Sequence, residues 1–393
     1  MGNAYSPSSY RSLGREARKR PRLLWIVHNS WESLEGQRPC ELIRRLVDRY
    51  EIHVISWSQP KGVDLTKLGA WRSFLDRKCE KLHIHHAFLL PNVYRAFVKG
   101  YPPQVMLYAN QLLFRRYIRR VIRGATFDVG VVSSSHHFTG YPPWEMKFPV
   151  IFDYLDLSPK SVEQKYCRHS SVVIAASPAM AARVAGCGRP TFVVPNGVDV
   201  ARLRTATPEM VRSSLEIGSS KVVSLIGLTM SASLYFVDAV ASVARSRDVV
   251  LLAVGDGPGR FAIEERCRQV GLRCLAPGWV SPDRVVEYFA VTDIGLYPGD
   301  DSEYFRAAMP LKILGYLAAG KPVVSSPVDA CAALGLRGVR IAPATVIGFA
   351  TALAELLDQP VQGPISLDDE FDWSRIAAQL ASIVDDAIAG RLV

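Results

Sequence analysis

Short apolar segments alternate with helical segments along most of this chain, and the alternation restarts near its middle. A first series of strands is expected at 23–28, 51–57, 128–134, 149–154, 171–177 and 191–195, with a helix over 38–50. A second series of strands follows at 221–227, 249–257, 292–298 and 321–326. One helix is expected over about 231–245, and another, after the second of these strands, ends at about 270. Short apolar strands between helices are typical of a parallel sheet covered on both faces. The pattern predicts an α/β protein with two doubly wound, Rossmann-like domains facing each other across a cleft.

The length of 393 residues is enough for two such domains. We expect a flexible basic tail over 1–20, an N-terminal domain over 21–196 and a second domain over 197–370. The stretch "PNGVD" at 195–199 supplies a linker. The last segment, 371–393, has apolar residues at helical spacing and can lie back across the first domain.

The net charge of +10 is concentrated in the first half of the chain. Residues 1–196 hold 29 Lys and Arg against 14 Asp and Glu, whereas residues 197–393 hold 18 Lys and Arg against 23 Asp and Glu. A basic half favours an anionic partner. It has no recognition helix and no aromatic RNA-binding pattern, which argues against nucleic acid.

One predicted helix, over 104–124, gathers its arginines on one face and its apolar residues on the other. Such a helix can lie on an anionic membrane surface. It can equally be an ordinary domain helix with a solvated arginine face, and the sequence leaves both readings open.

The segment "MPLKILGYLAAGKPVV" at 309–324 places a single lysine, Lys312, where an apolar helix begins. The helix dipole there favours negative charge, so a cation does not help the helix itself. Lys312 would, however, help the free N–H groups of the helix to hold a bound anion. A plain surface lysine is the alternative.

The order of motifs in the second half resembles the nucleotide-sugar domain of GT-B glycosyltransferases. These motifs are "PNGVD", "VGDGPG", "APGWVS", "TDIGLYP" and "PLKILGYLAAGKPVV". The resemblance covers nearly the whole chain from residue 23. The stretch "SVVIAASPAMAARV" at 171–184 is similar to the xanthan-type glucuronosyltransferases, which are inverting enzymes acting on lipid-linked oligosaccharides.

This resemblance implies a nucleotide-diphosphate sugar, UDP- or GDP-linked, as donor and no cofactor. Lys312 would stabilise the diphosphate as it leaves. The residues expected to bind the donor are Gly227, Gly255, Gly257, Gly278, Trp279, Val280, Tyr297, Glu303, Leu311 and Lys312. The glycines are also explained by tight turns, and Tyr297 by core packing.

The stretch "VIFDYLDLSP" at 150–159 supplies two carboxylates near a strand end, Asp153 and Asp156. Attack by an acceptor hydroxyl on an anomeric carbon needs a base that takes its proton. By the resemblance, Asp156 matches that base and Asp153 would support it. Helix capping or an Asx turn is the alternative for either residue.

Other polar residues follow strands that end at the expected acceptor cleft. Histidines in these positions are often structural, so acceptor binding is one of two readings. The candidates on the acceptor side are His28, Glu35, His136 and His137.

Two departures from the retaining branch of the superfamily affect the reading. Its pair of glutamates is replaced by Ala307 and Gly315, and the stretch after Gly227 has no basic residue. We therefore expect ribose recognition to differ, through Glu303 or backbone groups, and an inverting mechanism. No DxD pair occurs, so no metal is expected.

The function expected from these features is glycosyl transfer to a lipid-linked or glycan acceptor in surface polysaccharide assembly. A non-catalytic GT-B scaffold and a nucleotide-sugar epimerase are the alternatives. The seven scattered cysteines are typical of reduced thiols, and no apolar run approaches the ~18 residues that cross a bilayer. We expect a cytoplasmic protein, peripheral at the inner face of the cytoplasmic membrane.

Overall fold

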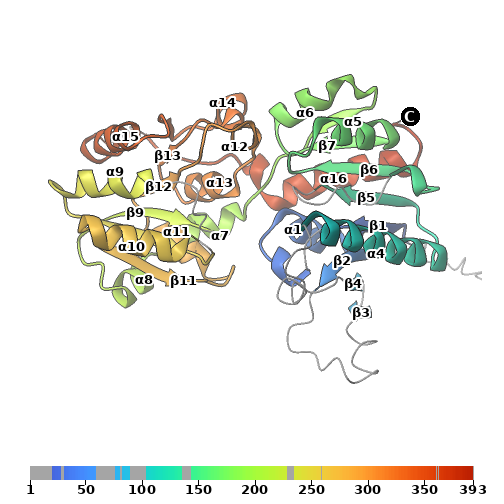
Figure 1. Ribbon diagram of the computed structural model, residues 1–393, viewed down its shortest axis with the longest axis horizontal. Helices are drawn as coiled ribbons and strands as arrows, with labels where there is room; N and C mark the ends of the chain where they lie inside the picture. The colour runs from blue at the N-terminus through green and yellow to red at the C-terminus, as the bar shows by residue number, and fades with distance from the viewer. Residues whose placement is uncertain are drawn as a thin grey trace, which may run out of the picture.

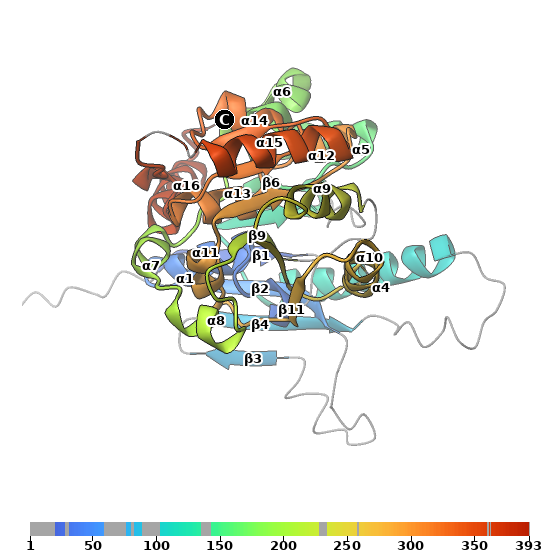
Figure 2. The ribbon, with the colours of Figure 1, turned by 90° about the vertical axis from the view of Figure 1, so that its left-hand side faces the viewer.

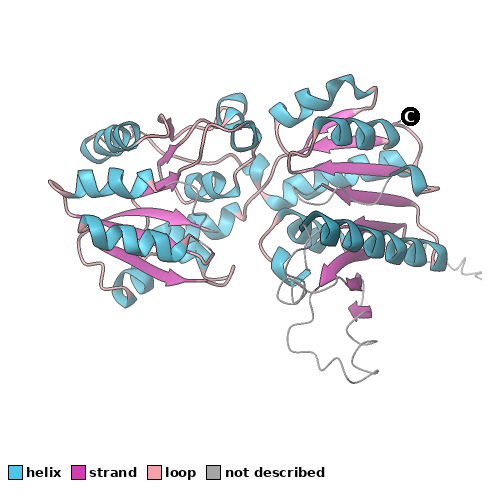
Figure 3. Cartoon of the chain, viewed as in Figure 1, coloured by secondary structure: helices cyan, strands magenta, loops and turns pink. Residues whose placement is uncertain are grey.

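The computed structural model describes residues 20–27, 31–58, 76–79, 82–88, 103–134, 143–227, 234–257, 259–359, 361 and 363–392. Within these ranges the chain forms two α/β domains, each built on a sheet with helices on both faces (Figures 1 and 3). The predicted fold class is confirmed. The predictions for the tail up to residue 19 and for His28, His136 and His137 lie outside the described residues.

The sheet of the N-terminal domain has eight described strands, parallel except for the edge pair β3 and β4. In spatial order they are β3 (Asp76–Cys79), β4 (Leu82–Phe88), β2 (Glu51–Ser58), β1 (Arg22–Ile26), β5 (Val129–Ser133), β6 (Val150–Tyr154), β7 (Val172–Ala175) and β8 (Thr191–Val193). The helices of this domain are α1 (Arg38–Leu46), α4 (Pro103–Gly124), α5 (Lys160–His169) and α6 (Pro178–Val184), with short 3₁₀ turns at Trp31–Leu34, Pro143–Glu145 and Ala185–Cys187.

The sheet of the C-terminal domain has six described strands, all parallel. In spatial order they are β11 (Cys274–Gly278), β10 (Val249–Val254), β9 (Lys221–Ile226), β12 (Ile294–Tyr297), β13 (Val323–Ser325) and β14 (Val339–Ile341). Its helices are α7 (Val200–Thr205), α8 (Glu209–Ser214), α9 (Tyr235–Ala244), α10 (Arg260–Val270), α11 (Val285–Val291), α12 (Glu303–Ala307), α13 (Leu311–Ala318), α14 (Asp329–Ala333) and α15 (Val346–Asp358).

Each sheet reverses its strand order once, and this reversal determines where a ligand can bind. In the first sheet β1 lies between β2 and β5, and in the second β9 lies between β10 and β12. Ligands of doubly wound proteins bind beyond the carboxyl ends of the strands at such a switch point. Gly227, which directly follows β9, therefore lies where a ligand of the second domain is expected.

The last helix, α16 (Trp373–Ile388), belongs to the first domain although it ends the chain. Figure 1 shows it in red among the blue and green elements, and Figure 2 places it on the same side as α1. The Tyr50 hydroxyl donates to Oδ1 of Asp385 at 2.6 Å and contacts the carbonyl of Ala381 at 3.1 Å. Buried side chains of α16 share one hydrophobic cluster with those of α1, β1 and β2.

The chain crosses between the domains twice, and the two crossings lie side by side. The Val198 N–H donates to the carbonyl of Phe371 at 2.9 Å, and the Trp373 N–H donates to the carbonyl of Val198 at 3.1 Å. A 3₁₀ turn, Asp369–Phe371, precedes α16. A Cβ added at Gly197 would lie 2.8 Å from the carbonyl oxygen of Phe371. Glycine at this position therefore allows the two crossing segments to pack against each other.

Helix α4 uses its apolar face to cover the first sheet. Phe114 and Ile118 are buried against β1, β5 and β6. Glu145 pairs with Arg115 and holds Arg119 in two hydrogen bonds of 2.8 and 2.9 Å. The apolar residues Phe114 and Ile118 are therefore used by the core, and the arginine face meets solvent together with Leu112 and Leu113. No described helix is long and apolar enough to cross a membrane.

Candidate functional site

Three glycines end three adjacent strands of the second sheet, and their backbones pack against one another. Gly227, Gly255 and Gly278 follow or end β9, β10 and β11 and have φ of +113°, +121° and +82°. The Gly255 N–H donates to the carbonyl of Gly278 at 2.8 Å. A Cβ added at Gly255 would lie 2.1 Å from the carbonyl oxygen of Gly227. Larger residues would not fit here, and the backbone of Gly227 and Gly255 can therefore lie close to a ligand in the cavity that they line.

Lys312 lies directly over the first of these turns. It is the second residue of α13, after Pro310, and its side chain crosses the face of Gly227. A Cβ added at Gly227 would lie 2.4 Å from Cε and 3.1 Å from Nζ of Lys312. Burial lowers the pKa of Lys312 to about 8, so the ammonium is still mostly protonated at pH 7. The cation thus lies between a helix N-terminus and a glycine turn.

A cavity of about 690 Å³ opens at this point between the two domains. The second domain contributes most of its wall. Its lining from this domain includes Asp199, Arg202, Gly227, Gly255, Asp256, Gly257, Trp279, Val280, Phe289, Leu311, Lys312 and Gly315. Glu35, Gly36 and Glu41 line it from the first domain. The structure therefore brings Gly227, Gly255, Gly257, Trp279, Val280, Leu311, Lys312 and Glu35 of the predicted site into one cavity.

Gly278 does not line the cavity itself but packs against Arg260. A Cβ there would lie 2.8 Å from Nη1 of Arg260, whose Nη2 donates to the carbonyl of Ala276 at 3.2 Å. The next residue, Trp279, is 69% exposed beside the cavity. A flat, accessible aromatic face of this kind can stack on a nucleobase.

Several lining residues were not predicted from the sequence. Asp199 and Arg202 belong to the start of α7, where Asp199 caps the helix by accepting from the Arg202 N–H at 3.1 Å. The Arg202 guanidinium donates to the carbonyl of Asp283 at 2.9 Å. Asp199 ends the "PNGVD" stretch, which was predicted as a linker and as a motif of the nucleotide-sugar domain, and Arg202 follows it by three residues.

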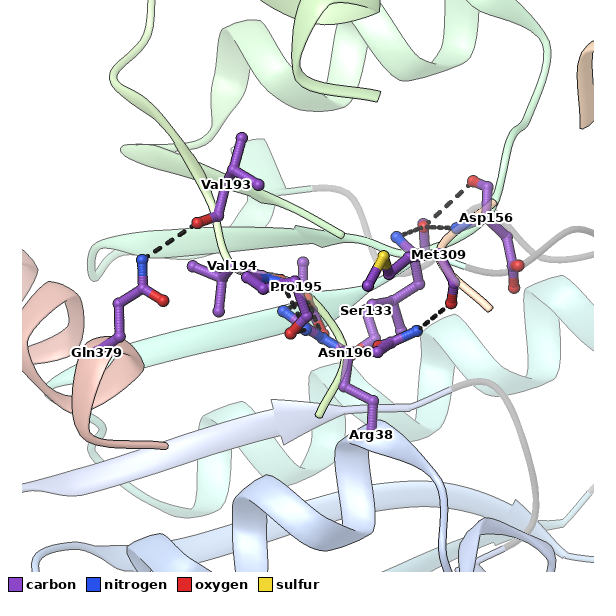
Figure 4. A network of polar contacts seen from close by, with 12 residues as sticks. Arg38, Ser133, Asp156, Val193, Val194, Pro195, Asn196, Met309 and Gln379 are labelled. Atoms are coloured by element: carbon purple, nitrogen blue, oxygen red, sulfur yellow. Dashed lines mark hydrogen bonds and ion pairs between the residues drawn. The ribbon is translucent and has the colours of Figure 1, made fainter. Parts of the chain in front are cut away.

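The first domain holds the segment that carries Lys312 by two hydrogen bonds to backbone carbonyls. The Ser177 hydroxyl, which also caps α6, donates to the carbonyl of Ala307 at 2.7 Å. The Asn196 amide donates to the carbonyl of Met309 at 2.7 Å, as Figure 4 shows. The position of Lys312 thus depends on contacts that cross between the domains.

Asp153 is fully buried and pairs with Arg38 of α1. Its Oδ1 lies 3.2 Å from both Nε and Nη2 of Arg38, and its Oδ2 accepts from the Ser133 hydroxyl at 3.0 Å. Nη1 of Arg38 donates to the carbonyls of Val194 and Pro195 at 2.7 Å each (Figure 4). This pair joins α1 to β6 and to the linker, a contact that was not predicted from the sequence.

Asp156 lies two residues past β6 and faces α12. Its N–H donates to the Ser134 hydroxyl at 3.1 Å, which fixes its backbone to the end of β5. Oδ1 accepts from the hydroxyl of Tyr304 at 3.2 Å. Among the described residues, Asp156 is not part of the cavity wall that contains Lys312.

Tyr297 and Glu303 do not reach the cavity, contrary to expectation. The Tyr297 ring stacks on Phe305 at 4.8 Å between centroids, and burial raises the pKa of its hydroxyl. Glu303 forms an ion pair with Arg183 of α6, which also binds Glu163 at 2.5 Å. In this geometry Tyr297 packs in the core and Glu303 contacts the first domain, and ribose binding by Glu303 stays a prediction.

The position of the second missing glutamate is filled by an aromatic ring. A Cβ added at Gly315 would lie 2.6 Å from Cζ of Phe289. A glutamate there would need Phe289 to move. Among the described residues, one group of potential metal ligands lies close enough together to share an ion, and it is Glu51, His53 and His83, outside the cavity wall.

Each domain matches a family of known proteins. Residues 36–202 match the model described as Glycosyltransferase Family 4, and residues 221–359 match the model described as Glycosyl transferases group 1. A stretch of 49 residues is 45% identical to TuaH of Bacillus subtilis (strain 168), named as a teichuronic acid biosynthesis glycosyltransferase. That stretch spans 12% of this chain and 12% of TuaH.

Solved structures share the whole architecture. Sucrose-phosphate synthase from Thermosynechococcus elongatus superposes with a TM-score of 0.71 at 14% identity, over 94% of this chain and 100% of that one. HepE (Alr3699) from Anabaena, in complex with UDP and glucose, superposes with a TM-score of 0.65 at 16% identity, over 93% of this chain and 100% of that one. At these identities the likeness concerns the fold.

Proposed function

The chain belongs to the GT-B glycosyltransferases, and from this premise we propose that it transfers a sugar from a nucleotide-diphosphate donor to a lipid-linked or glycan acceptor in surface polysaccharide assembly. The observation that carries the donor part is the position of Lys312 over Gly227 in the cavity between the domains. HepE, which shares the fold, was solved with UDP and glucose.

The donor's diphosphate is proposed to lie between Lys312 and the glycine turns at the ends of β9 and β10. Backbone N–H groups, the N-terminus of α13 and the ammonium of Lys312 all favour an anion there. When the bond between the anomeric carbon and the diphosphate breaks, negative charge grows on the leaving oxygen. A fixed cation lowers the barrier to that step. The nucleobase, of UDP or GDP, would stack on Trp279.

Asp156 is proposed as the general base of an inverting displacement. The acceptor hydroxyl gives its proton to the carboxylate as its oxygen bonds to the anomeric carbon, and the diphosphate departs from the opposite face. Tyr304 holds the carboxylate at the interface between the domains. The proposal needs no metal, because Lys312 and the helix N-terminus supply the positive charge.

The acceptor and the location are proposed from the basic domain. Arg116, Arg120 and Arg123 of α4 are exposed, and Leu112 is 50% exposed beside them. Each basic residue near an anionic membrane surface contributes about 1 kcal/mol of attraction. This favours a peripheral site at the inner face of the cytoplasmic membrane, where lipid-linked acceptors are found. The local similarity to TuaH supports polysaccharide synthesis.

A non-catalytic scaffold is the second candidate, and the filled position of Gly315 favours it. Without the ribose-binding glutamate of the retaining enzymes, the cavity has to hold a donor by other groups. An epimerase would need no acceptor domain, and donor turnover without any acceptor would support it.

Titration calorimetry with UDP, GDP and the other nucleoside diphosphates tests the donor proposal. We expect one diphosphate to bind, and Lys312→Ala to lose most of that affinity. Lys221→Ala is the matched control, because Lys221 lies at the opposite end of β9 and pairs with Asp293 at 3.0 Å. If no diphosphate binds, or if Lys312→Ala binds as the wild type does, the scaffold becomes the better account.

A further inference from the structure

A second group of polar side chains lies toward the amino ends of the strands, away from the cavity. Glu51 and His53 are two residues apart on β2, and His83 and His85 are two apart on β4. His53 pairs directly with His83 across the two strands. Because every second residue of a strand points to the same face, these four side chains share one face of the sheet.

The distances within this group suit metal coordination. Oε1 of Glu51 lies 3.3 Å from Nε2 of His53 and 3.7 Å from Nε2 of His83. One ligand atom from each of these three residues lies within 4.8 Å of the other two. Ligand atoms that bind one zinc ion at about 2.1 Å lie at separations of this order.

His85 contacts one of the three candidate ligands, His53, and can orient its ring. Its Nε2 lies 3.0 Å from Nδ1 of His53, which leaves Nε2 of His53 directed toward Glu51. Histidine ligands ordinarily donate their second ring N–H to a carboxylate, a backbone carbonyl or water, which fixes the ring, and here the Nε2 atom of His85 can accept in the same way. His53 is buried, so the core around it restricts the movement of its ring.

In the structure, the guanidinium of Arg22 lies beside the ligand atoms of His53 and Glu51, where a metal ion would bind. Nη2 of Arg22 lies 3.2 Å from Nε2 of His53 and 3.1 Å from Oε1 of Glu51. The rings of His53 and His83 are stacked at 4.3 Å. A metal ion therefore requires Arg22 to withdraw and the two rings to turn toward a common point. Arg22 is half-buried at the start of β1, and its long side chain can reach solvent from there.

We propose that Glu51, His53 and His83 form a binding site for a divalent transition metal of the zinc class, with His85 orienting His53 and Arg22 as the competing cation. Two imidazoles and one carboxylate are a ligand set that zinc accepts, with water at the fourth position. The ion would join β2 to β4, next to the edge strand β3, and so stabilise this side of the sheet. The site is independent of the proposed sugar transfer.

Calorimetry with zinc chloride on the metal-stripped, tag-free full chain tests the site. We expect about one zinc ion per chain, and more than about tenfold weaker binding in His53→Gln and in His83→Gln, since even an outer partner of a ligand contributes that much. His169→Gln is the matched control, because His169 contacts the carbonyl of Lys165 on α5. Arg22→Gln should bind zinc more tightly than the wild type.

Melting curves give a second readout that does not depend on the calorimeter. Zinc should raise the melting temperature of the wild type in a concentration-dependent way and should leave that of His83→Gln unchanged. His83 is more exposed than His53, so its variant decides the question if His53→Gln does not fold. The proposal is wrong if the wild type does not bind zinc, if His83→Gln binds it as tightly, or if Arg22→Gln binds it more weakly.

Discussion

The hydroxyl of Tyr304 donates a hydrogen bond of 3.2 Å to Oδ1 of Asp156, and this bond joins α12 of one domain to the end of β6 in the other. Burial, together with the charge of Asp156, raises the pKa of Tyr304, so the phenol keeps its proton. A donor held against a carboxylate stabilises the ionised form of that carboxylate. Closure of the domains and the charge of the proposed base are thereby linked.

Replacing Tyr304 by phenylalanine should slow transfer and shift its pH profile. The bond also holds the carboxylate in place at the interface between the domains, so its loss should misplace the proposed base and lower kcat by roughly tenfold or more. Without the donor the pKa of Asp156 rises, because the ionised form loses a partner. The acid limb of the kcat/KM profile should therefore move to higher pH, by about one unit. Initial rates of transfer between pH 4 and 8 measure both effects.

Glu303→Gln separates this effect from a general loss of domain contact. Glu303 is on the same helix and also contacts the first domain, through Arg183, but it does not contact Asp156. We expect its acid limb to match that of the wild type. An identical shift in both variants would mean that Tyr304 acts only by holding the domains together.

Gly227→Ala should weaken diphosphate binding about as much as Lys312→Ala does. The added Cβ would lie 2.4 Å from Cε of Lys312, so the side chain has to leave the turn. Gly271→Ala is the control for backbone strain, because Gly271 also has a positive φ, +69°, but has no atom within 4 Å of an added Cβ. Calorimetry on both variants compares them, and equal losses would rule out the contact with Lys312 as the cause.

Diphosphate affinity should decrease above pH 8. The pKa of Lys312 is lowered to about 8 by burial, and only the protonated ammonium attracts the diphosphate. Below that pH the attraction is fully present, and above it the affinity should fall, approaching tenfold per pH unit. Binding measured from pH 7 to 9.5 tests this slope. Lys312→Ala should show weak binding that changes little over the same range, and an equal slope in that variant would assign the effect to another group.

Asp153→Asn should destabilise the N-terminal domain strongly. The change leaves the buried guanidinium of Arg38 without its charge partner, at a cost of about 3–5 kcal/mol. Asp358→Asn, which breaks the exposed pair with Arg247, should cost far less. Urea unfolding followed by tryptophan fluorescence, to which the buried Trp25 beside Ser133 contributes, measures both variants. Similar midpoints for the two variants would contradict the role given to Asp153.

The sequence was sufficient for the architecture because apolar runs of strand length are a strong local signal. It did not predict β4, whose "LHIHHAF" reads as polar, nor β11, whose "CLAPG" contains proline and glycine. Both strands form because their neighbours β2 and β10 offer a register of backbone partners. Tertiary pairing of this kind overrides local preference.

The residues of the cavity and its surroundings could also be predicted only in part from the sequence. The glycines and Lys312 stood out because their residue types are unusual for their places in a strand–turn–helix pattern. Arg38 did not, because its partner Asp153 is 115 residues away and nothing local requires an arginine at the start of α1. Glu303 was expected to take over from the missing ribose-binding glutamate, whereas in the structure it pairs with Arg183.

Gly315→Glu should fail to create the ribose contact that retaining relatives are expected to make. An added Cβ lies 2.6 Å from Cζ of Phe289, so the larger side chain overfills the wall and costs about 1–3 kcal/mol. The double variant Gly315→Glu with Phe289→Ala removes the ring and provides room. We expect the single variant to melt at lower temperature and to bind UDP or GDP no better than the wild type, and the double variant to bind more tightly than the single one. If the single variant already binds UDP or GDP more tightly than the wild type, the ring of Phe289 moves aside at little cost. The contact with Phe289 then does not explain why this cavity has no glutamate at position 315.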